Sequence, residues 1–307
     1  MKSPHRHPTR IVTFVLAFLA TSQLVTDAAS AATLDRVRQN GKIILAYRTD
    51  ARPFSYRDES GNAAGYSIDL CQQIVDQVKS KLQMPSIAAE WVPVSVEDQF
   101  RAVQEGKVDV LCAAASETLT RRKDVSFSVP IFFGGIGALL RTDAPAGLKE
   151  VLSGRRPTGP LWRGYPATVL EKQTFSVVAG TTSEIWLARK LNQFQLTATV
   201  IPVQGYDAGV RRVVERSSNV SFGDRAILLD AAKRSPSSHE LTVLERQFTY
   251  EPLALALARD DEDFRLLVDQ TLVHFFSSEE FRSLHTKWFG EPDETAMMFF
   301  KMNMPPD

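Results

Sequence analysis

The sequence KIILAY, Lys42–Tyr47, is a short apolar run that follows Gly41, and it indicates a buried β-strand. In the later stretch Ser67–Leu82, apolar residues recur at intervals of three and four, which predicts an amphipathic helix. Ile87–Val94 then predicts a second strand. Strands separated by single helices are typical of right-handed βαβ units, so the sequence predicts an α/β fold with a parallel sheet.

The alternation of strands and helices continues along the rest of the chain. Further helices are expected over Leu34–Asn40, Val96–Glu105, from Thr181–Glu184 onward, and over Asp207–Arg216, Ala226–Lys233, Phe264–Phe276 and Glu279–Trp288; further strands are expected over Val108–Ala114, Phe175–Ala179, Thr197–Val203, Val220–Phe222 and Leu253–Ala258. The sequence TTSE at Thr181–Glu184 has the pattern of a capping box. Thr142–Lys172 contains many Gly, Pro and Arg residues and predicts an irregular loop, to which we assign no role. Periodicity alone leaves open whether these elements form one long sheet or two lobes.

The amino terminus has the features of a secretory signal peptide. The first ten residues carry three basic residues and no acid, Ile11–Val25 is largely apolar, and Ala29–Ala31 is an A-x-A cleavage site. The alternative is an uncleaved membrane anchor, but the uninterrupted apolar part, Phe14–Ala20, is much shorter than the roughly 20 residues that a spanning helix needs. We therefore expect export, with residues 1–31 removed.

Charge and composition exclude several classes of function. The chain has 36 basic and 36 acidic residues, and residues 1–31 hold three of the basic ones and one acid, so the remaining 276 residues have a net charge of −2. A near-neutral domain lacks the basic surface that nucleic acid or an anionic membrane requires. The five His are scattered and no Cys/His spacing indicates a metal site, so we expect neither a metal nor a cofactor.

Cys71 and Cys112 are the only cysteines. In an oxidising compartment they could form a disulfide. Alternatively both are buried free thiols, since free cysteine behaves as a small hydrophobic residue. Cys71 lies on the apolar face of a predicted helix and Cys112 in a predicted strand, and we favour the free thiols.

Several short motifs, taken in their order and spacing, resemble those of a known family. They are Gly41–Tyr56 (GKIILAYRTDARPFSY), Gly65–Leu70 (GYSIDL), Gln104–Asp109 (QEGKVD), Arg121 with Phe127–Phe132 (FSVPIF), Gly180–Glu184 (GTTSE) and Lys287–Phe289 (KWF). Residues 34–290 resemble the bacterial periplasmic amino-acid-binding proteins that serve ABC importers, solute-binding protein family 3, and in particular its glutamate/aspartate-binding branch.

The resemblance implies a two-lobed periplasmic-binding-protein fold of type II, with two parallel-rich sheets, flanking helices and two crossing strands. Lobe 1 would comprise residues 32–131 and 252–307 and lobe 2 residues 136–247, with hinges near 132–135 and 248–251. An amino acid would bind between the lobes, and hinge closure would trap it, as in periplasmic binding proteins generally. The resemblance further implies a periplasmic monomer that delivers its ligand to the permease of an ABC importer.

Carried over residue by residue, the resemblance assigns groups to both ends of an amino acid. Arg121 would bind the α-carboxylate in a bidentate manner that Lys cannot reproduce, with Ser116 beside it; otherwise Arg121 is a surface charge. Thr181 and Thr182 would offer backbone N–H groups at a helix start, or simply cap that helix. Asp224 would pair with the ammonium group, or cap the helix that follows it.

Arg48 corresponds to the family position that contacts the ligand side chain, and an Arg there favours an acidic ligand, glutamate or aspartate. Gln99 and Tyr206 would complete this side of the pocket, at positions where the branch has a second Arg and a His. Val96 and Ala114 replace serines of the branch. The departures remove a cation and several hydrogen-bond donors, so a ligand side-chain carboxylate would find fewer partners here than in that branch.

Two other functions fit the same resemblance. Periplasmic dehydratases of the prephenate or arogenate type share the fold, and Glu117, next to the predicted clamp, is the one nearby candidate for their general acid or base. A binding protein could also serve a sensor or chemoreceptor rather than a permease. We expect binding without catalysis.

Overall fold

A computed structural model describes residues 32–154 and 165–306 of the 307-residue chain. The predicted signal peptide and residues 155–164 of the predicted loop lie outside the described residues. Ala32–Asp307 form one compact unit. Within the part that the structure describes, no helix is both long and apolar enough to cross a membrane.

The first of two large sheets contains the predicted strand KIILAY. Its strands are β5 (Ala88–Val94), β1 (Lys42–Arg48), β6 (Val110–Ser116), β14 (Glu251–Leu257) and β7 (Ser126–Phe127) in that order, and β8 (Phe132–Gly134) also pairs with β14. β1 is parallel to β5 and β6, whereas β14 is antiparallel to its three partners. The associated helices are α1 (Thr33–Asn40), α2 (Tyr66–Leu82), α3 (Gln99–Gln104), the 3-10 turn η1 (Arg121–Lys123), α9 (Glu262–Phe276), α10 (Glu279–Phe289) and α11 (Glu294–Asn303).

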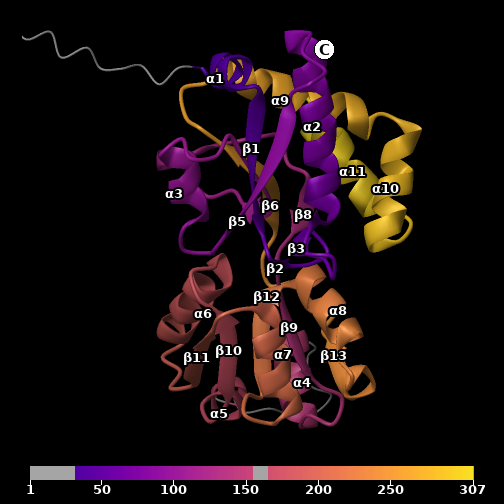
Figure 1. Cartoon of the computed structure of the whole chain (residues 1–307). Coiled ribbons are helices and arrows are strands. Elements are labelled where there is room, and N and C mark those ends of the chain that lie inside the picture. The colour runs from indigo at the N-terminus through magenta and orange to yellow at the C-terminus, as the bar shows by residue number, and fades with distance from the viewer. Residues whose placement is uncertain (1–31, 155–164, 307) are drawn as a thin grey trace, which may run out of the picture. The chain divides into compact units, whose positions relative to one another are not determined.

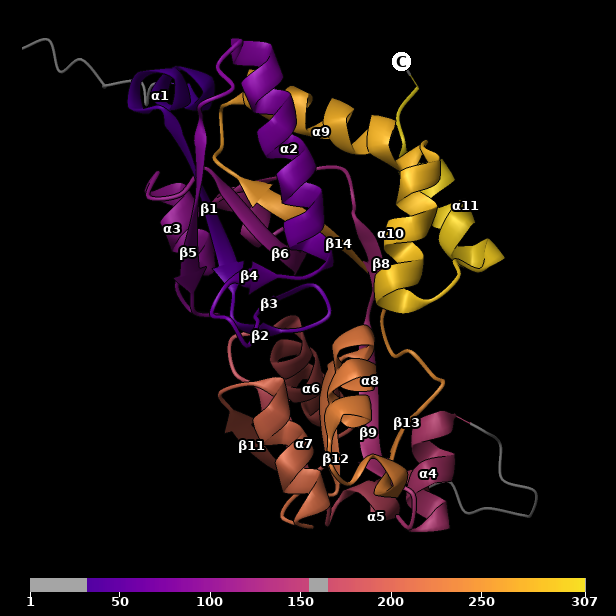
Figure 2. The ribbon, with the colours of Figure 1, turned by 45° about the vertical axis from the view of Figure 1, so that its right-hand side comes forward.

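The alternation of leucine and alanine in β14 shows how helices cover both faces of this sheet. Leu253 and Leu255 pack in the apolar cluster that also holds buried residues of α2 and α9, whereas Ala254 and Ala256 belong to the cluster that holds Val103 of α3. The larger side chains therefore fill the space under the two long helices, and the small ones let α3 approach closely. Burying one leucine side chain contributes about 1.5–3 kcal/mol. Figures 1 and 2 show α9, α10 and α11 on the α2 side of the sheet.

The second sheet has the same plan of parallel strands extended by antiparallel ones. Its order is β11 (Thr199–Val203), β10 (Thr174–Val178), β12 (Val220–Asp224), β9 (Ile136–Arg141) and β13 (Leu241–Val243). β10 is parallel to β11 and β12, and β9 runs antiparallel to β12 and β13. Its helices are α4 (Ala146–Ser153), α5 (Tyr165–Leu170), α6 (Thr182–Gln193), α7 (Tyr206–Val214), α8 (Arg225–Arg234) and the 3-10 turn η2 (Ser238–Glu240).

The chain passes between the two sheets twice, from β8 into β9 and back from β13 into β14, and this gives the two-lobed type II fold (Figure 1). The two crossing segments touch. A Cβ atom at Gly135 would overlap the carbonyl oxygen of Thr249, so only glycine fits at this approach. The side chain of Gln247 also donates to the carbonyl of Gly134 at 2.6 Å.

A small third sheet, absent from the sequence predictions, follows β1. It consists of β2 (Asp50–Ala51), β3 (Ser55–Arg57) and β4 (Ala63–Ala64), and the peptide bond between Arg52 and Pro53 is cis. These strands are too short to show periodicity. They place the side chains of Asp50 and Arg52 close to the second lobe, as described below.

Most predicted elements are present, but the sequence did not predict the strands β7, β8, β9 and β13 or the two 3-10 turns. Three further differences concern helices. α3 begins at Gln99 rather than Val96, because the hydroxyl of Ser95 bonds to the side chain and the N–H of Asp98 and holds a turn there. The expectation of an irregular loop over Thr142–Lys172 is wrong in part, since α4 and α5 lie within it. α11 was not predicted; Asp293 caps it by accepting from the N–H of Ala296.

The prediction of two free thiols is wrong. Cys71 of α2 and Cys112 of β6 form a disulfide, and both residues are fully buried. The physical reason is that α2 packs directly on β6, so the two side chains face each other between helix and sheet. A helix face and a strand face can each be read from periodicity, but their mutual register cannot.

Candidate functional site

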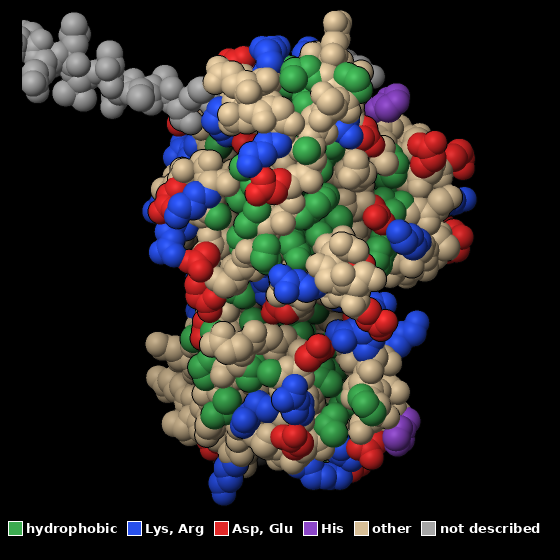
Figure 3. Space-filling view, in the orientation of Figure 1, with side chains coloured by type: hydrophobic (Ala, Val, Ile, Leu, Met, Phe, Trp, Pro, Cys, Tyr) green, Lys and Arg blue, Asp and Glu red, His purple; other side chains and the backbone are tan. Residues whose placement is uncertain are grey.

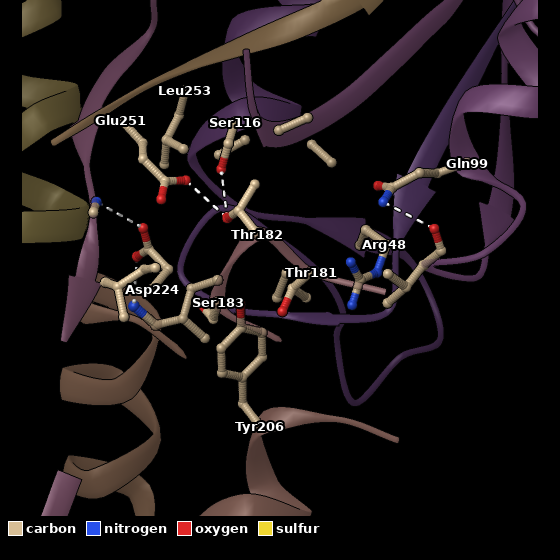
Figure 4. Close-up of a pocket in the computed structure, with 18 of the residues that line it drawn as sticks. Arg48, Gln99, Ser116, Thr181, Thr182, Ser183, Tyr206, Asp224, Glu251 and Leu253 are labelled. Carbon is tan, nitrogen blue, oxygen red and sulfur yellow. Dashed lines mark hydrogen bonds between the residues drawn. The ribbon is translucent and has the colours of Figure 1, made fainter. Parts of the chain in front are cut away.

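One pocket lies where strands of both sheets end. Arg48 and Ser116 are the last residues of the parallel strands β1 and β6, Asp224 is the last residue of β12, and Thr181 and Tyr206 follow β10 and β11. Ligands of α/β proteins bind outside the carboxyl ends of strands. All eight residues predicted to bind a ligand line this pocket of about 580 Å³, part of it open to solvent: Arg48, Gln99, Ser116, Arg121, Thr181, Thr182, Tyr206 and Asp224. Figure 4 labels all of them except Arg121. Their contact with a ligand stays a prediction.

Arg121 presents a cation to the pocket, and no acid among the described residues forms an ion pair with it. Its guanidinium donates to the carbonyl of Ser116 at 2.8 Å and lies over the ring of Phe100, 4.7 Å from the ring centre. Within residues 32–154 and 165–306 it forms no ion pair. Burial lowers the pKa of Arg121, although a guanidinium stays charged at neutral pH. A half-buried guanidinium without an ion-pair partner among the described residues suits the binding of a carboxylate.

Two acids line the same pocket, and the sequence predicted only one of them. Asp224 accepts hydrogen bonds from the N–H groups of Ala226 and Ile227 at 2.9 and 3.3 Å, and its other oxygen accepts from Gly135 at 3.3 Å. It therefore caps α8, as the alternative interpretation held, and lines the pocket as well. Burial raises the pKa of Asp224 to about 6. The backbone hydrogen bonds favour the charged form and offset part of the effect of burial.

Glu251, the second acid, begins β14 and connects the crossing strand to the second lobe. Its carboxylate accepts from the hydroxyl of Thr182 at 2.8 Å and from that of Thr249 at 2.9 Å. The hydroxyl oxygens of Thr182 and Ser116 lie 3.4 Å apart, so one chain of polar groups joins the end of β6 to the start of α6 (Figure 4). Neither Glu251 nor Asp224 pairs with a cation among the described residues.

The predicted capping box at the start of α6 is wrong. Thr181 is the N-cap residue, but its hydroxyl donates to the carbonyl of Val178 at 2.7 Å and does not cap the helix. Glu184 accepts from the N–H of Gly180 rather than from that of Thr181. The first turn of α6 is thus left without a side-chain cap, and it faces the pocket with its positive dipole end.

A fourth charged group, Arg48, lies on the far side of the pocket from the two acids (Figure 4). Arg48 is buried, and its Nε and Nη2 donate to one carboxylate oxygen of Asp50 at 2.9 and 2.5 Å. Gln99 lies nearby and donates its Nε2 to the carbonyl of Val96 at 3.1 Å. Tyr206 is buried, and burial raises the pKa of its phenol. Val96 and Ala114 line the pocket without polar side-chain groups, as the sequence indicated.

Sequence reasoning missed Glu251, Ser183 and Asp50, of which the first two line the pocket. Glu251 lies two residues before the apolar stretch LALALA and falls in the predicted second hinge, so an acid at that position was a signal that could have been used. Asp50 lies in a two-residue strand that has no pattern of its own.

The residue considered for catalysis lies elsewhere. Glu117 does not line the pocket, and its carboxylate lies 3.5 Å from Nε of Arg122. Among the described residues, no group of three or more His, Cys, Asp or Glu is placed to hold a metal ion. Within the part of the chain that the structure describes, the pocket instead presents one cation without an acid partner, Arg121, and two acids without a cation partner at separate positions, which suits a small zwitterion.

Comparison with known proteins identifies the family. The sequence profile described as bacterial extracellular solute-binding proteins, family 3, matches residues 43–291. A glutamate/aspartate import solute-binding protein of Escherichia coli is 28% identical over 280 residues, which cover 90% of this chain and 86% of that protein. An L-glutamate/L-aspartate-binding protein of Pseudomonas aeruginosa is 25% identical over 93% of this chain and 88% of that protein.

Solved structures agree on the fold. A cysteine-binding protein from Campylobacter jejuni has a TM-score of 0.69 at 17% identity and covers 87% of this chain and 98% of its own. An ancestral amino-acid-binding protein, a precursor of cyclohexadienyl dehydratase, has a TM-score of 0.68 at 24% identity and covers 84% of this chain and all of its own. At these identities the likeness concerns the fold alone.

Proposed function

The chain belongs to the family of bacterial extracellular solute-binding proteins, family 3, and we propose that it captures an amino acid, with glutamate or aspartate preferred, between its two lobes and delivers it to an ABC importer. The observation that carries this proposal is the separation of charges in one pocket. Arg121 faces it without a protein acid, and Asp224 and Glu251 face it without a protein cation among the described residues. A free amino acid would supply both missing partners.

In this proposal the α-carboxylate accepts from Arg121 and from backbone N–H groups at the start of α6, close to Ser116 and Thr182. The ammonium group donates to Asp224 and Glu251. The ligand side chain extends toward Arg48, Gln99 and Tyr206. Two relatives whose names specify glutamate and aspartate, together with Arg48 on that side, support the acidic preference.

We propose further that the mature protein begins after Ala31, works in the periplasm as a monomer and binds its ligand without transforming it. The position of Glu117 outside the pocket supports binding over dehydratase chemistry. Both oxygens of Asp224 accept hydrogen bonds from backbone N–H groups, which holds its carboxylate in a fixed position for an ionic contact with the ligand. Incubation with prephenate or arogenate should yield no product; formation of one would contradict the binding function.

A thermal-shift panel of the common L-amino acids and small dicarboxylates tests the proposal. A ligand that binds only the folded state at about 100 times its Kd stabilises the protein by roughly 2.7 kcal/mol, which raises the melting temperature by several degrees. We expect glutamate and aspartate to give the largest shifts among the acidic and neutral amino acids. A panel without any response would contradict an amino-acid ligand.

A further inference from the structure

We propose that Asp50 is a specificity-determining residue of this site: by pairing with Arg48 it lets the pocket bind the carboxamide side chains of glutamine and asparagine nearly as tightly as acidic ones. This inference rests on the proposed function and refines its ligand class. The evidence is the contact geometry of Arg48, the charge that Asp50 adds, and the hydrogen-bonding groups beside the pair.

Arg48 is held in place by the protein before any ligand arrives. It is 7% exposed, and its backbone N–H donates to the hydroxyl of Ser55, which in turn donates to the carbonyl of Arg48, at 2.9 and 3.1 Å. Its guanidinium donates from both Nε and Nη2 to Oδ1 of Asp50. The edge of Arg48 that suits a bidentate carboxylate is therefore occupied by a carboxylate of the protein.

Asp50 is itself confined by the second lobe. Its Oδ2 lies against Gly205, where a Cβ atom would be 3.2 Å away, and Gly205 directly precedes Tyr206. Asp50 thus lies between Arg48 on one side and the start of α7 on the other. This position keeps its negative charge next to Arg48 when the lobes are in contact.

The charge of the pair decides what it can attract. Arg48 and Asp50 together are neutral, so a carboxylate on the ligand side chain meets a negative charge beside the positive one. At close range this repulsion offsets much of the attraction that a lone arginine would exert. A neutral side chain loses nothing from the presence of Asp50, because it carries no charge to be repelled.

The neighbouring groups fit an amide better than a carboxylate. Nη1 of Arg48 is a donor that Asp50 leaves available, and it can donate to the amide oxygen. Gln99 lines the pocket and uses its Nε2 on Val96, so its Oε1 is an acceptor for an amide NH₂ group. A carboxylate has no hydrogen to donate to that oxygen. The side-chain end of the pocket thus contains a donor and an acceptor, as an amide requires.

Titration calorimetry with glutamate and glutamine separates the two possibilities. In the wild-type protein we expect the Kd for glutamine to be at most about tenfold above that for glutamate. Asp50→Asn keeps the size of the side chain and removes its charge. In this variant we expect glutamate to bind more tightly, so that the Kd for glutamine divided by the Kd for glutamate rises about tenfold. Glu59→Gln removes one charge at an exposed position in the turn between β3 and β4 of the same small sheet and should leave the ratio unchanged.

Asp50→Ser provides a second variant in case Asp50→Asn folds poorly, and circular dichroism checks both. A wild-type preference for glutamate greater than about tenfold, or a Kd ratio that neither variant changes, would overturn the role of Asp50 while leaving the proposed function in place. If the wild-type protein bound no amino acid, the proposed function would fail, and this inference with it.

Discussion

Arg121 and Arg122 are adjacent in the chain but have different surroundings. Arg121 lines the pocket over the ring of Phe100, whereas the side chain of Arg122 is 61% exposed and lies 3.5 Å from Glu117. Sequence alone could not separate them, because both belong to the charged run Arg121–Lys123 and only the resemblance singled out the first. This pair provides a matched test of the predicted carboxylate contact.

We expect Arg121→Ala to weaken the binding of the responding amino acid at least about 100-fold. The reason is that truncating one partner of a buried, charge-assisted pair costs about 2–5 kcal/mol. Arg122→Ala should change the Kd by less than about twofold, since an exposed ion pair contributes little. Calorimetric titration of the two variants measures this difference, and equal effects would contradict the assignment.

The raised pKa of Asp224 leads us to expect that ligand binding depends on pH. Since burial raises its pKa to about 6 in the ligand-free protein, it is charged at pH 7.5 and largely protonated at pH 5. An ammonium group requires the charged form, so the affinity should be constant above about pH 7 and fall about tenfold by pH 5. Asp224→Asn, which still caps α8, should bind more weakly and show no such decrease.

The stability of the ligand-free protein should change in the opposite direction with pH. The pKa of Asp224 is raised above its unfolded value of 3.8, so the folded state binds the proton more tightly. Its contribution to stability is fully present below about pH 4 and is lost as the pH rises through about 6. The free energies of unfolding of wild type and Asp224→Asn, measured by denaturant titration between pH 4 and pH 7, should therefore converge at low pH. A difference between the two proteins that stays the same at every pH would argue against a raised pKa of Asp224.

A pocket position could be predicted from the sequence where a residue ends or follows a recognisable strand; ligand contact stays a prediction. Arg48 and Asp224 could be placed because each ends or follows a recognisable strand, and carboxyl ends of strands meet. Asp50 could not be placed, because its pairing with Arg48 depends on a turn between two very short strands. The sequence also left open whether Asp224 caps a helix or faces a ligand, because an acid at that position suits both roles.

At the scale of elements, the disulfide joins helix α2 to strand β6, whose last residue, Ser116, lines the pocket. Residues 41 positions apart are linked, and closing a loop of that length is expected to stabilise a protein by about 2–4 kcal/mol. We predict that Cys71→Ala/Cys112→Ala lowers the free energy of unfolding by this amount, measured by denaturant titration. Reduction of the disulfide in the wild-type protein should lower the free energy of unfolding by the same amount. A double variant as stable as the oxidised wild-type protein would mean that the disulfide does not form.

Long elements were predicted better than short ones. α2 and β1 have full periodic patterns, and their observed bounds differ from the expected ones by a single residue. The strands β2, β3 and β4 and the helix α4 are either too short or flanked by too many Gly and Pro residues to give a pattern. Tertiary contacts with their neighbours, rather than local preference, determine that they form.

On the scale of the whole molecule, an ion pair links the lobes beyond the pocket itself. Nε of Arg52 in the hairpin lies 3.2 Å from Asp230 of α8, and Asp230 is further bonded to Arg234. Charged side chains of both signs are interspersed on the face of the molecule that Figure 3 shows, in keeping with the small net charge. No charge of one sign dominates that face, and the ion pair of Arg52 with Asp230 is a specific contact between the two lobes.

We expect Arg52→Ala to shift the lobes toward an open arrangement. The lost ion pair is partly exposed and contributes up to about 1 kcal/mol, which corresponds to a few-fold weaker ligand binding. Small-angle X-ray scattering should show a larger radius of gyration for ligand-free Arg52→Ala than for wild type, and the same radius for both once ligand is saturating. Identical ligand-free radii would show that this ion pair does not favour closure.

The central claim is that one amino acid binds in the pocket between the lobes. Isothermal titration of L-glutamate into protein that has been unfolded, dialysed and refolded to remove carried-over ligand tests it most directly. We predict saturable binding of one ligand per chain, lost in Arg121→Ala and retained in Arg122→Ala. Absence of binding by glutamate and by every other common amino acid, or binding that Arg121→Ala leaves unchanged, would contradict the claim.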